Sequence, residues 1–301
     1  MIPQPQTLDL DVGHVQRRAM DFLALAKVRV VLMVLVTTYA GFYLGTRGAP
    51  DYLRLLRTLI GTALAAGGTL ALNQLLERDV DAKMQRTRRR PLPDGRLQPI
   101  EALIFGGSIT VAGILYLAVA VNWLSAVVTA ATSVTYLFWY TPLKRKTPLC
   151  SVIGALPGAL PPVTGWVAAH QGFGIDAWIL FAILFLWQVP HSLAIARLYR
   201  EDYARAGIQF LPIVEPDARS TGRQVVTNCA ALLVIGMLPT LVGLAGATYF
   251  FTALILSVGF LACAASFAVT RTAAAARQLL LASLLYLPAV LLVMALDKVP
   301  M

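Results

Sequence analysis

The segment Asn73–Pro91, NQLLERDVDAKMQRTRRRP, interrupts a strongly apolar chain with a dense group of polar side chains. It holds one asparagine, three acidic and six basic residues in nineteen positions, whereas only 13% of the whole chain is charged. On both sides the sequence returns to apolar runs of about 20 residues, the length of a membrane-spanning helix. This contrast predicts a polytopic helical membrane protein in which the segment forms the end of one helix and the loop after it.

The composition excludes an ordinary soluble protein. The chain has 301 residues, is 58% hydrophobic and carries a net charge of +10, and its mean hydropathy is +0.70. The positive charge does not indicate a nucleic-acid partner, because lysine and arginine collect on the cytoplasmic loops of membrane proteins. The three cysteines lie far apart and form neither a metal-ligand spacing nor a disulfide framework.

The apolar runs predict an all-α bundle of nine transmembrane helices in one domain, 23–301, after a cytoplasmic N-terminal tail, 1–22. The tail contains acidic residues and no apolar run, which excludes a cleavable signal peptide. Small residues and prolines in the fifth span favour either close helix packing or a wide central cavity, which we expect to open toward the cytoplasm. The nine expected spans are 26–46, 55–76, 100–120, 123–141, 150–169, 175–196, 224–245, 248–270 and 278–296.

The distribution of basic residues predicts the orientation. All but four of the 25 lysines and arginines lie on the tail or on the loops after the even-numbered spans. The positive-inside rule places that side in the cytoplasm, hence the N-terminus inside and the C-terminus outside. We therefore expect a multi-pass protein of a prokaryotic inner or plasma membrane. The functional polar residues concentrate in two cytoplasmic loops, which echo each other weakly and suggest two half-sites.

The first loop begins with a stripe of oxygen-bearing side chains. Asn73, Glu77 and Asp81 are spaced i, i+4, i+8 and share one face of a helix. Carboxylates at the end of an apolar helix are costly unless they have a function, and Mg²⁺ uses one or two carboxylates to reach substrate phosphates. The alternative is a helix end at which the acids simply pair with nearby arginines.

Basic residues near this stripe are candidates for binding a diphosphate. Lys83, Arg86 and Arg90 follow it directly, and Lys144 and Arg145 stand where the fourth span meets the same side. Arginine binds phosphate oxygens bidentately. The alternative role for all of these cations is an anchor on anionic lipid.

The second loop and the helix before it supply further candidates. Glu201 and Asp202 are candidate ligands of a second cation, with a solvated ion-pair cluster as the alternative. Tyr199, Arg200 and Tyr203 stand beside them as candidate substrate-binding residues. His191 lies two to three turns deeper in the membrane, where an ionisable side chain is a candidate site residue. It is suited to binding iron, donating a hydrogen bond, acting as a base, or packing.

Taken together, these residues resemble the UbiA superfamily of membrane prenyltransferases, and within it the branch that farnesylates haem. The superfamily pattern Asn-Asp-x-x-Asp-x-x-x-Asp falls on Asn73, Gln74, Glu77 and Asp81. Its second pattern falls on Tyr199 and Tyr203, which weakens the second metal cluster, and Cys150 stands where the haem branch has asparagine. The haem branch is similar in five further motifs: Met84-x-Arg86-Thr87-x-x-Arg90-Pro91-Leu92, Tyr140-Thr141 to Lys144-Arg145-x-Thr147-Pro148, Ile153-Gly154 to Pro161-Pro162-x-x-Gly165-Trp166, Trp187-x-x-Pro190-His191, and Tyr199-Arg200-x-Asp202-Tyr203-x-x-Ala206-Gly207-Ile208.

The resemblance implies transfer of a farnesyl group from farnesyl diphosphate to a vinyl group of haem b, with Mg²⁺ as cofactor. It assigns a catalytic or substrate-binding role to Tyr140 and to the loop residues named above. It also suggests a haem A synthase or a terminal oxidase as a partner. The alternatives are another prenyl acceptor, such as 4-hydroxybenzoate, a quinone precursor or a chlorin, and a transporter with an anion site.

Overall fold

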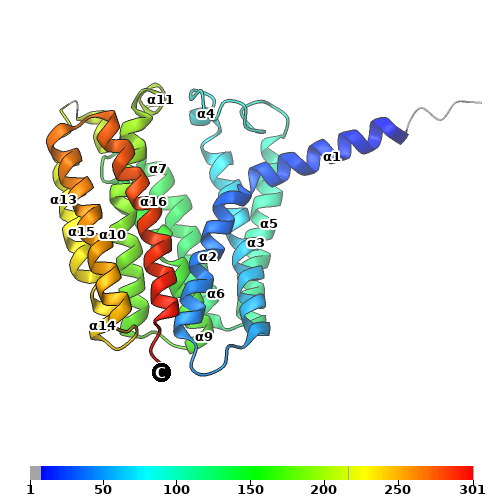
Figure 1. Cartoon of the computed structure of the whole chain (residues 1–301). Helices are drawn as coiled ribbons and strands as arrows, with labels where there is room; N and C mark the ends of the chain where they lie inside the picture. The colour runs from blue at the N-terminus through cyan, green and yellow to red at the C-terminus, as the bar shows by residue number, and fades with distance from the viewer. Residues whose placement is uncertain (1–7, 216, 301) are drawn as a thin grey trace, which may run out of the picture.

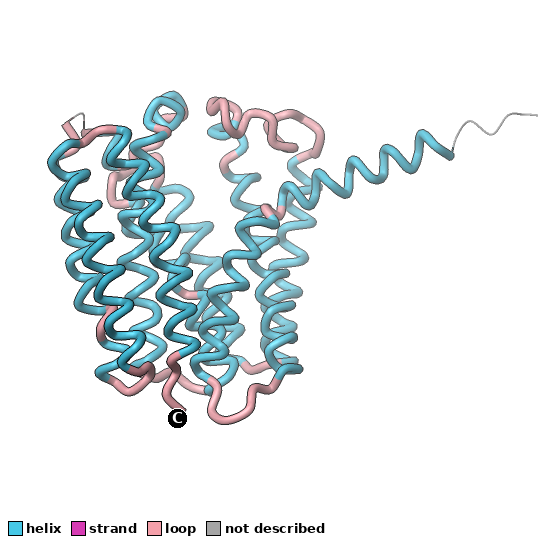
Figure 2. Tube along the Cα trace, in the orientation of Figure 1, coloured by secondary structure: helices cyan, strands magenta, loops and turns pink. Residues whose placement is uncertain are grey.

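The protein is a bundle of membrane-length helices with its loops gathered at the two ends (Figures 1 and 2). The computed structural model describes residues 8–215 and 217–300. Eight helices or helix pairs in this part are long and apolar enough to cross a membrane. They are α2 (Val28–Gly45), α3 (Tyr52–Leu76), α5 (Pro99–Ala120), α8 with α9 (Cys150–Ala159 and Pro161–His170), α10 (Ile175–Leu198), α13 with α14 (Arg219–Ile235 and Leu238–Leu241), α15 (Ala247–Thr270) and α16 (Ala273–Leu296).

The remaining expected span, 123–141, falls on three consecutive helical pieces. These are α6 (Trp123–Val134), the π-helix η1 (Thr135–Tyr140) and α7 (Thr141–Leu143). Pro142 explains the π-turn, because its nitrogen cannot donate to the carbonyl four residues earlier and its ring would clash with it. The hydroxyl of Thr141 instead donates to the carbonyl of Tyr136, at 2.8 Å. The helical path therefore continues, and a count of nine spans depends on treating these three pieces as one.

Both polar loops lie at one end of the bundle, and the C-terminus lies at the other (Figure 1). The first loop begins with the short helix α4 (Arg78–Asp81), and the second contains α11 (Arg200–Arg205) and α12 (Leu211–Val214). The two loops therefore share one end of the bundle, as predicted, and the orientation of that end toward the cytoplasm stays a prediction.

The N-terminal segment is more ordered than the expected tail. Helix α1 (Leu8–Leu25) runs sideways out of the bundle and joins α2 through Lys27, whose backbone is left-handed (φ 51°, ψ 56°). Residues 1–7 of the expected tail lie outside the described residues. Side chains of Arg18 and Asp21 pair with Glu101 and Arg96, so the base of α1 is fixed to the first polar loop and to α5.

Small residues allow the helices to pack at close range, as expected where lipid removes the hydrophobic driving force between helices. A β-carbon on Gly41 would lie 1.9 Å from the carbonyl oxygen of Pro162, and one on Gly165 would lie 1.9 Å from that of Thr38. These contacts lock α2 against α9. The small residues of the fifth span thus serve packing against α2.

We expect Gly165→Ala to destabilise the bundle by about 1–3 kcal/mol or more, because the added methyl group meets backbone that cannot move aside. Unfolding in a denaturing-detergent titration measures this change. Gly259→Ala on α15 is the matched control, since nothing lies within 4 Å of its added carbon. Equal stability of the two variants would contradict the tight α2–α9 contact.

Candidate functional site

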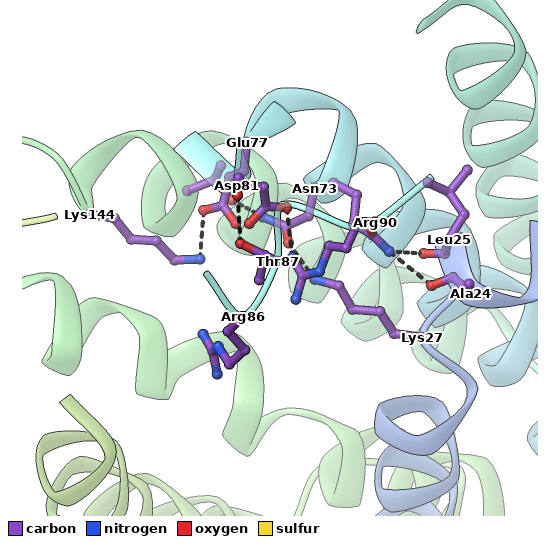
Figure 3. Close-up of polar contacts among 12 residues, drawn as sticks. Ala24, Leu25, Lys27, Asn73, Glu77, Asp81, Arg86, Thr87, Arg90 and Lys144 are labelled. Carbon is purple, nitrogen blue, oxygen red and sulfur yellow. Dashed lines mark hydrogen bonds and ion pairs between the residues drawn. The ribbon is translucent and has the colours of Figure 1, made fainter. Parts of the chain in front are cut away.

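The predicted stripe stands at the point where α3 ends. Helix α3 stops at Leu76, Glu77 leaves helical geometry (φ −98°, ψ 7°), and α4 resumes at Arg78. Backbone bonds from Glu77 to Asn73 (3.0 Å) and from Asp81 to Glu77 (2.8 Å) bridge the break. The i, i+4, i+8 relation therefore survives, and Figure 3 shows the three side chains side by side.

Asn73 is fully buried and held from two sides. Its Oδ1 accepts a hydrogen bond from Nζ of Lys27 at 3.0 Å, and its Nδ2 donates to Oγ1 of Thr141 at 3.0 Å. The start of α2 and the start of α7 thus fix the orientation of this amide, with its oxygen toward Lys27.

Both carboxylates of the stripe are paired with basic residues, one from the same loop and one from a distant part of the chain (Figure 3). Glu77 pairs with Lys144 at 2.7 Å, and Asp81, which is 1% exposed, pairs with Arg90 at 2.6 Å. Burial by itself raises the pKa of Glu77, but the ammonium of Lys144 outweighs it and holds that pKa below its usual range. Glu77 is therefore available as an anionic oxygen ligand, and the buried side chain of Asp81 places two further oxygens beside it. The alternative interpretation, ion pairing at a helix end that opens into water, accounts for these contacts but not for the burial of the two acids.

Gln74 explains one departure from the superfamily pattern. Its Nε2 donates to the carbonyls of Ala24 (3.0 Å) and Leu25 (2.7 Å) at the end of α1. An aspartate cannot donate these bonds. In this chain the position therefore holds α1 to α3, and the ligand stripe consists of Asn73, Glu77 and Asp81.

Lys27 is a site residue that the sequence analysis missed. It lies between α1 and α2, and burial followed by the nearby guanidinium of Arg90 lowers its pKa to about 7. In the sequence it is a single lysine ahead of the first apolar run, which is typical of a membrane anchor. Only its contact with Asn73, 46 residues away, reveals its position.

The two polar loops are in direct contact through side-chain and backbone hydrogen bonds. The guanidinium of Arg86 donates to the hydroxyl of Tyr203 at 3.2 Å and lies 5.2 Å from the ring centre of Tyr199. The backbone N–H of Gln85 donates to Asp202 at 3.3 Å, and Arg205 also pairs with that carboxylate. Within the first loop, Thr87 donates to the carbonyl of Asp81 at 2.8 Å.

The second cation site expected on Glu201 and Asp202 stays a prediction. Glu201 is exposed, and Asp202 is engaged by Gln85 and Arg205. Within residues 8–215 and 217–300, no group of three or more histidine, cysteine or acidic side chains has the arrangement of a metal site. The second loop supplies contacts to the first loop, and the Asn73 stripe remains the candidate cation site.

The other predicted residues divide between the site and the surface. Lys144 lies 4.2 Å from the ring centre of Tyr140, so Lys144 and Tyr140 both belong to the candidate site. Gly154 leaves room for that ring, because a β-carbon there would lie 2.4 Å from one of its atoms. Lys83 and Arg145 are exposed, and Arg200 is half-buried. Arg86, Tyr199 and Glu201 are exposed as well, so these six candidates lie at the rim of the candidate site or outside it.

His191 of α10 is tied to α16 by a directional chain of hydrogen bonds. Its Nδ1 lies 2.8 Å from the hydroxyl of Ser283, and that hydroxyl donates to the carbonyl of Leu280 at 2.6 Å. Since the serine proton is used there, Nδ1 must donate and Nε2 must carry the lone pair. Trp187 stacks on the imidazole at 4.8 Å and donates to the Ser283 carbonyl at 2.8 Å. These contacts hold the imidazole in place and leave the lone pair on Nε2, so a packing role and a chemical role of His191 are compatible.

The chain is similar to known proteins over most of its length. The UbiA prenyltransferase family matches residues 34–290. Protoheme IX farnesyltransferase of Solibacter usitatus is 47% identical over 287 residues, which cover 92% of this chain and 98% of the relative. The same enzyme of Koribacter versatilis is 43% identical over 288 residues, covering 92% and 93%.

Two solved structures share the fold. Digeranylgeranylglyceryl phosphate synthase superposes with a TM-score of 0.80 at 16% identity, over 93% of this chain and 98% of its own. A UbiA homologue from Archaeoglobus fulgidus, bound to GPP and Mg²⁺, has a TM-score of 0.66 at 16% identity, over 91% and 99%.

We expect Arg90→Gln to destabilise the protein by about 2–3 kcal/mol, because it leaves the buried carboxylate of Asp81 without its partner. Adding Asp81→Asn should recover much of this loss, and unfolding titrations of the single and double variants measure it. Arg89→Gln, at an exposed neighbouring position, is the control. Additive losses in the double variant would argue against the ion pair.

Proposed function

The chain belongs to the UbiA prenyltransferase family, and we propose that it transfers a farnesyl group from farnesyl diphosphate to a vinyl group of haem b, giving haem O and diphosphate. The observation that carries this proposal is the buried cluster of Glu77, Asp81 and their basic partners, in a chain similar over 92% of its length to enzymes named protoheme IX farnesyltransferase. The cluster offers oxygen ligands beside cations, which a metal-assisted diphosphate leaving group requires.

The donor set of the stripe fits a hard divalent cation. Glu77 and Asp81 supply anionic oxygens, and Asn73 supplies a neutral one, as Mg²⁺ prefers. The homologue of known structure with GPP and Mg²⁺ supports the same pairing of prenyl diphosphate and cation. When bound, Mg²⁺ neutralises charge that develops on the leaving diphosphate.

The basic residues carry the rest of the electrostatic stabilisation. Lys144 and Arg90 neutralise the carboxylates in the structure, and we propose that they turn to diphosphate oxygens once a cation takes those carboxylates. Lys27 and Arg86 approach from α2 and from the contact between the loops. Donors already fixed around the leaving group favour breakage of the C–O bond.

His191 is the proposed proton acceptor in the later half of the reaction. After the allylic cation forms, the vinyl carbon bonds to it, and the positive charge passes to the neighbouring carbon. Water adds its oxygen to that carbon, and its proton passes to Nε2 of His191, the nitrogen that Ser283 leaves unprotonated. Ser283 is thus a positioning residue.

The location of the reaction follows from the same charges. Several apolar helices make the chain a multi-pass membrane protein. We propose the plasma membrane of a bacterium with the site on the cytoplasmic side, since nearly all basic residues lie at that end. The product is a modified haem, so the proposed partner is an enzyme or oxidase assembly that consumes it.

We expect Glu77→Gln and Asp81→Asn each to lower turnover by roughly 100-fold or more, because each removes an anionic ligand while keeping its shape. The assay incubates membranes with haem b, farnesyl diphosphate and Mg²⁺ and follows farnesylated haem by mass. Asp79→Asn, exposed and two residues from each target, should keep wild-type activity. Full activity of either target variant would remove the metal-site assignment.

The same assay separates this function from its alternatives. Wild-type membranes should release diphosphate only with haem b as acceptor. Prenylation of 4-hydroxybenzoate instead would assign another acceptor, and binding of farnesyl diphosphate without release of diphosphate would indicate a binding protein or transporter.

We expect Ser283→Ala to lower the kcat of haem O formation by roughly tenfold with little change in KM, because His191 loses the bond that fixes its tautomer. The mass of part of the product should then be lower by one water molecule. The carbocation on the former vinyl group loses a proton instead when no base activates a water to add to it. Ser192→Ala, which removes a hydroxyl bonded within its own helix (Val189 carbonyl, 3.0 Å), is the control. An unchanged product ratio in Ser283→Ala would count against the base.

A further inference from the structure

A second group of cations lies at the other end of the bundle, far from the Asn73 site. Arg47, Arg54, Arg57 and Lys298 are the four lysines and arginines that belong neither to the N-terminal segment up to Arg29, nor to the loops of the candidate site, nor to the region of the α15–α16 connection. Three of them fall on the short connection between α2 and α3 and on the first turns of α3, next to the end where the C-terminus lies (Figure 1). The proposed prenyl transfer uses none of them.

A pocket of about 210 Å³ opens between these helix ends. It lies where α2 ends, α3 begins and α9 ends. Its lining consists of Phe42, Gly45, Thr46, Arg47, Ala49, Asp51, Arg54, Ala169 and His170. Beside the pocket α2 and α9 approach closely, because a β-carbon on Gly45 would lie 3.1 Å from the ring of Trp166.

The negative ends of α2 and α9 are already neutralised by other groups. Nζ of Lys298 donates to the carbonyls of Tyr43 (2.8 Å) and Thr46 (2.5 Å), where α2 ends. The amide of Asn122 donates to the carbonyl of Val167 at 2.8 Å, in the last turn of α9. The helix dipoles that would repel an anion are therefore capped.

The acidic residue of the lining is also engaged. Asp51 is the N-cap of α3, and its carboxylate accepts from the backbone N–H of Arg54 at 2.9 Å and lies 4.0 Å from that side chain. Arg47 has no ion pair within the described ranges. His170 adds a buried Nδ1 that has no hydrogen-bond partner in the same part of the chain. The pocket is thus lined by two guanidinium groups, those of Arg47 and Arg54.

We propose that this pocket binds the phosphate group of a membrane lipid headgroup. Guanidinium groups bind phosphate oxygens bidentately, and a half-buried pocket strengthens that pairing relative to open water. A pocket of this volume has room for one phosphate group with part of its headgroup.

The surroundings favour a lipid over free phosphate. Large apolar side chains near the mouth point outward: Tyr52 is 73% exposed, Leu53 56% and Tyr39 47%. In a membrane these side chains meet acyl chains and the headgroup region, where tyrosine is enriched. A phosphate bound between Arg47 and Arg54 would therefore have its acyl chains against the outer surface of α2 and α3.

Native mass spectrometry of the full-length protein in detergent, titrated with phosphatidylglycerol, tests this site without any enzymatic assay. The wild type should retain one phosphatidylglycerol, and the double variant Arg47→Gln/Arg54→Gln should bind it roughly tenfold or more weakly. Arg57→Gln removes a third arginine from the same face of α3 but outside the pocket lining, so it is the matched control and should bind as the wild type does. A galactolipid with the same acyl chains and no phosphate should not be retained.

Two further measurements keep the result independent of folding. Ala49→Phe fills the pocket from an exposed loop position without changing any charge, and it should weaken retention as well. Equal retention by the wild type and the double variant would overturn the proposal. Displacement of the lipid by submillimolar inorganic phosphate would overturn the assignment to a lipid. Either result leaves the prenyl-transfer proposal untouched, since that site lies at the opposite end.

Discussion

The structure depends on keeping two carboxylates charged where water hardly reaches. Asp81 is 1% exposed, and the side chains of Glu77 and Lys144 are 14% and 12% exposed. A buried charge without a partner costs several kcal/mol, so each acid requires its cation in place. Arg90 comes from the same loop as Asp81, whereas Lys144 comes from the end of the fourth expected span. The ion pairs therefore fix the fold of the first loop and its position against the end of the fourth expected span.

The first apolar helices are arranged around this constraint. The left-handed backbone at Lys27 turns the chain from α1 into α2 and brings its ammonium to Asn73. Gln74 then holds the end of α1 by two carbonyl bonds. An aspartate at that position would give up both bonds, which is a structural reason for the departure of this chain from the superfamily pattern. The last turns of α3 thus place Asn73 in the candidate site, while Gln74 holds α1 in position.

The two polar loops have different tasks despite their similar sequences. The first supplies oxygen ligands and cations, while the second contributes Tyr203 and Asp202, which hold Arg86 and the backbone of Gln85. Tyrosines in place of the superfamily acids suit this role, because a phenol can accept from a guanidinium and stack against it. The contacts of the two loops are therefore asymmetric: the candidate ligands belong to the first loop, and the second loop holds Arg86 and the backbone of Gln85.

The sequence by itself determined the apolar spans, the shared end of the two loops and the Asn73, Glu77 and Asp81 stripe, because hydropathy and the i, i+4 period are local properties. The break of α3 at Glu77 leaves that stripe intact. Only the tertiary structure decided which cation faces which acid, the place of Lys27 and the use of Asp202 as a contact between loops. Pairings such as Lys144 with Glu77 join residues 67 positions apart, and no local pattern specifies them, since helix packing brings the partners together.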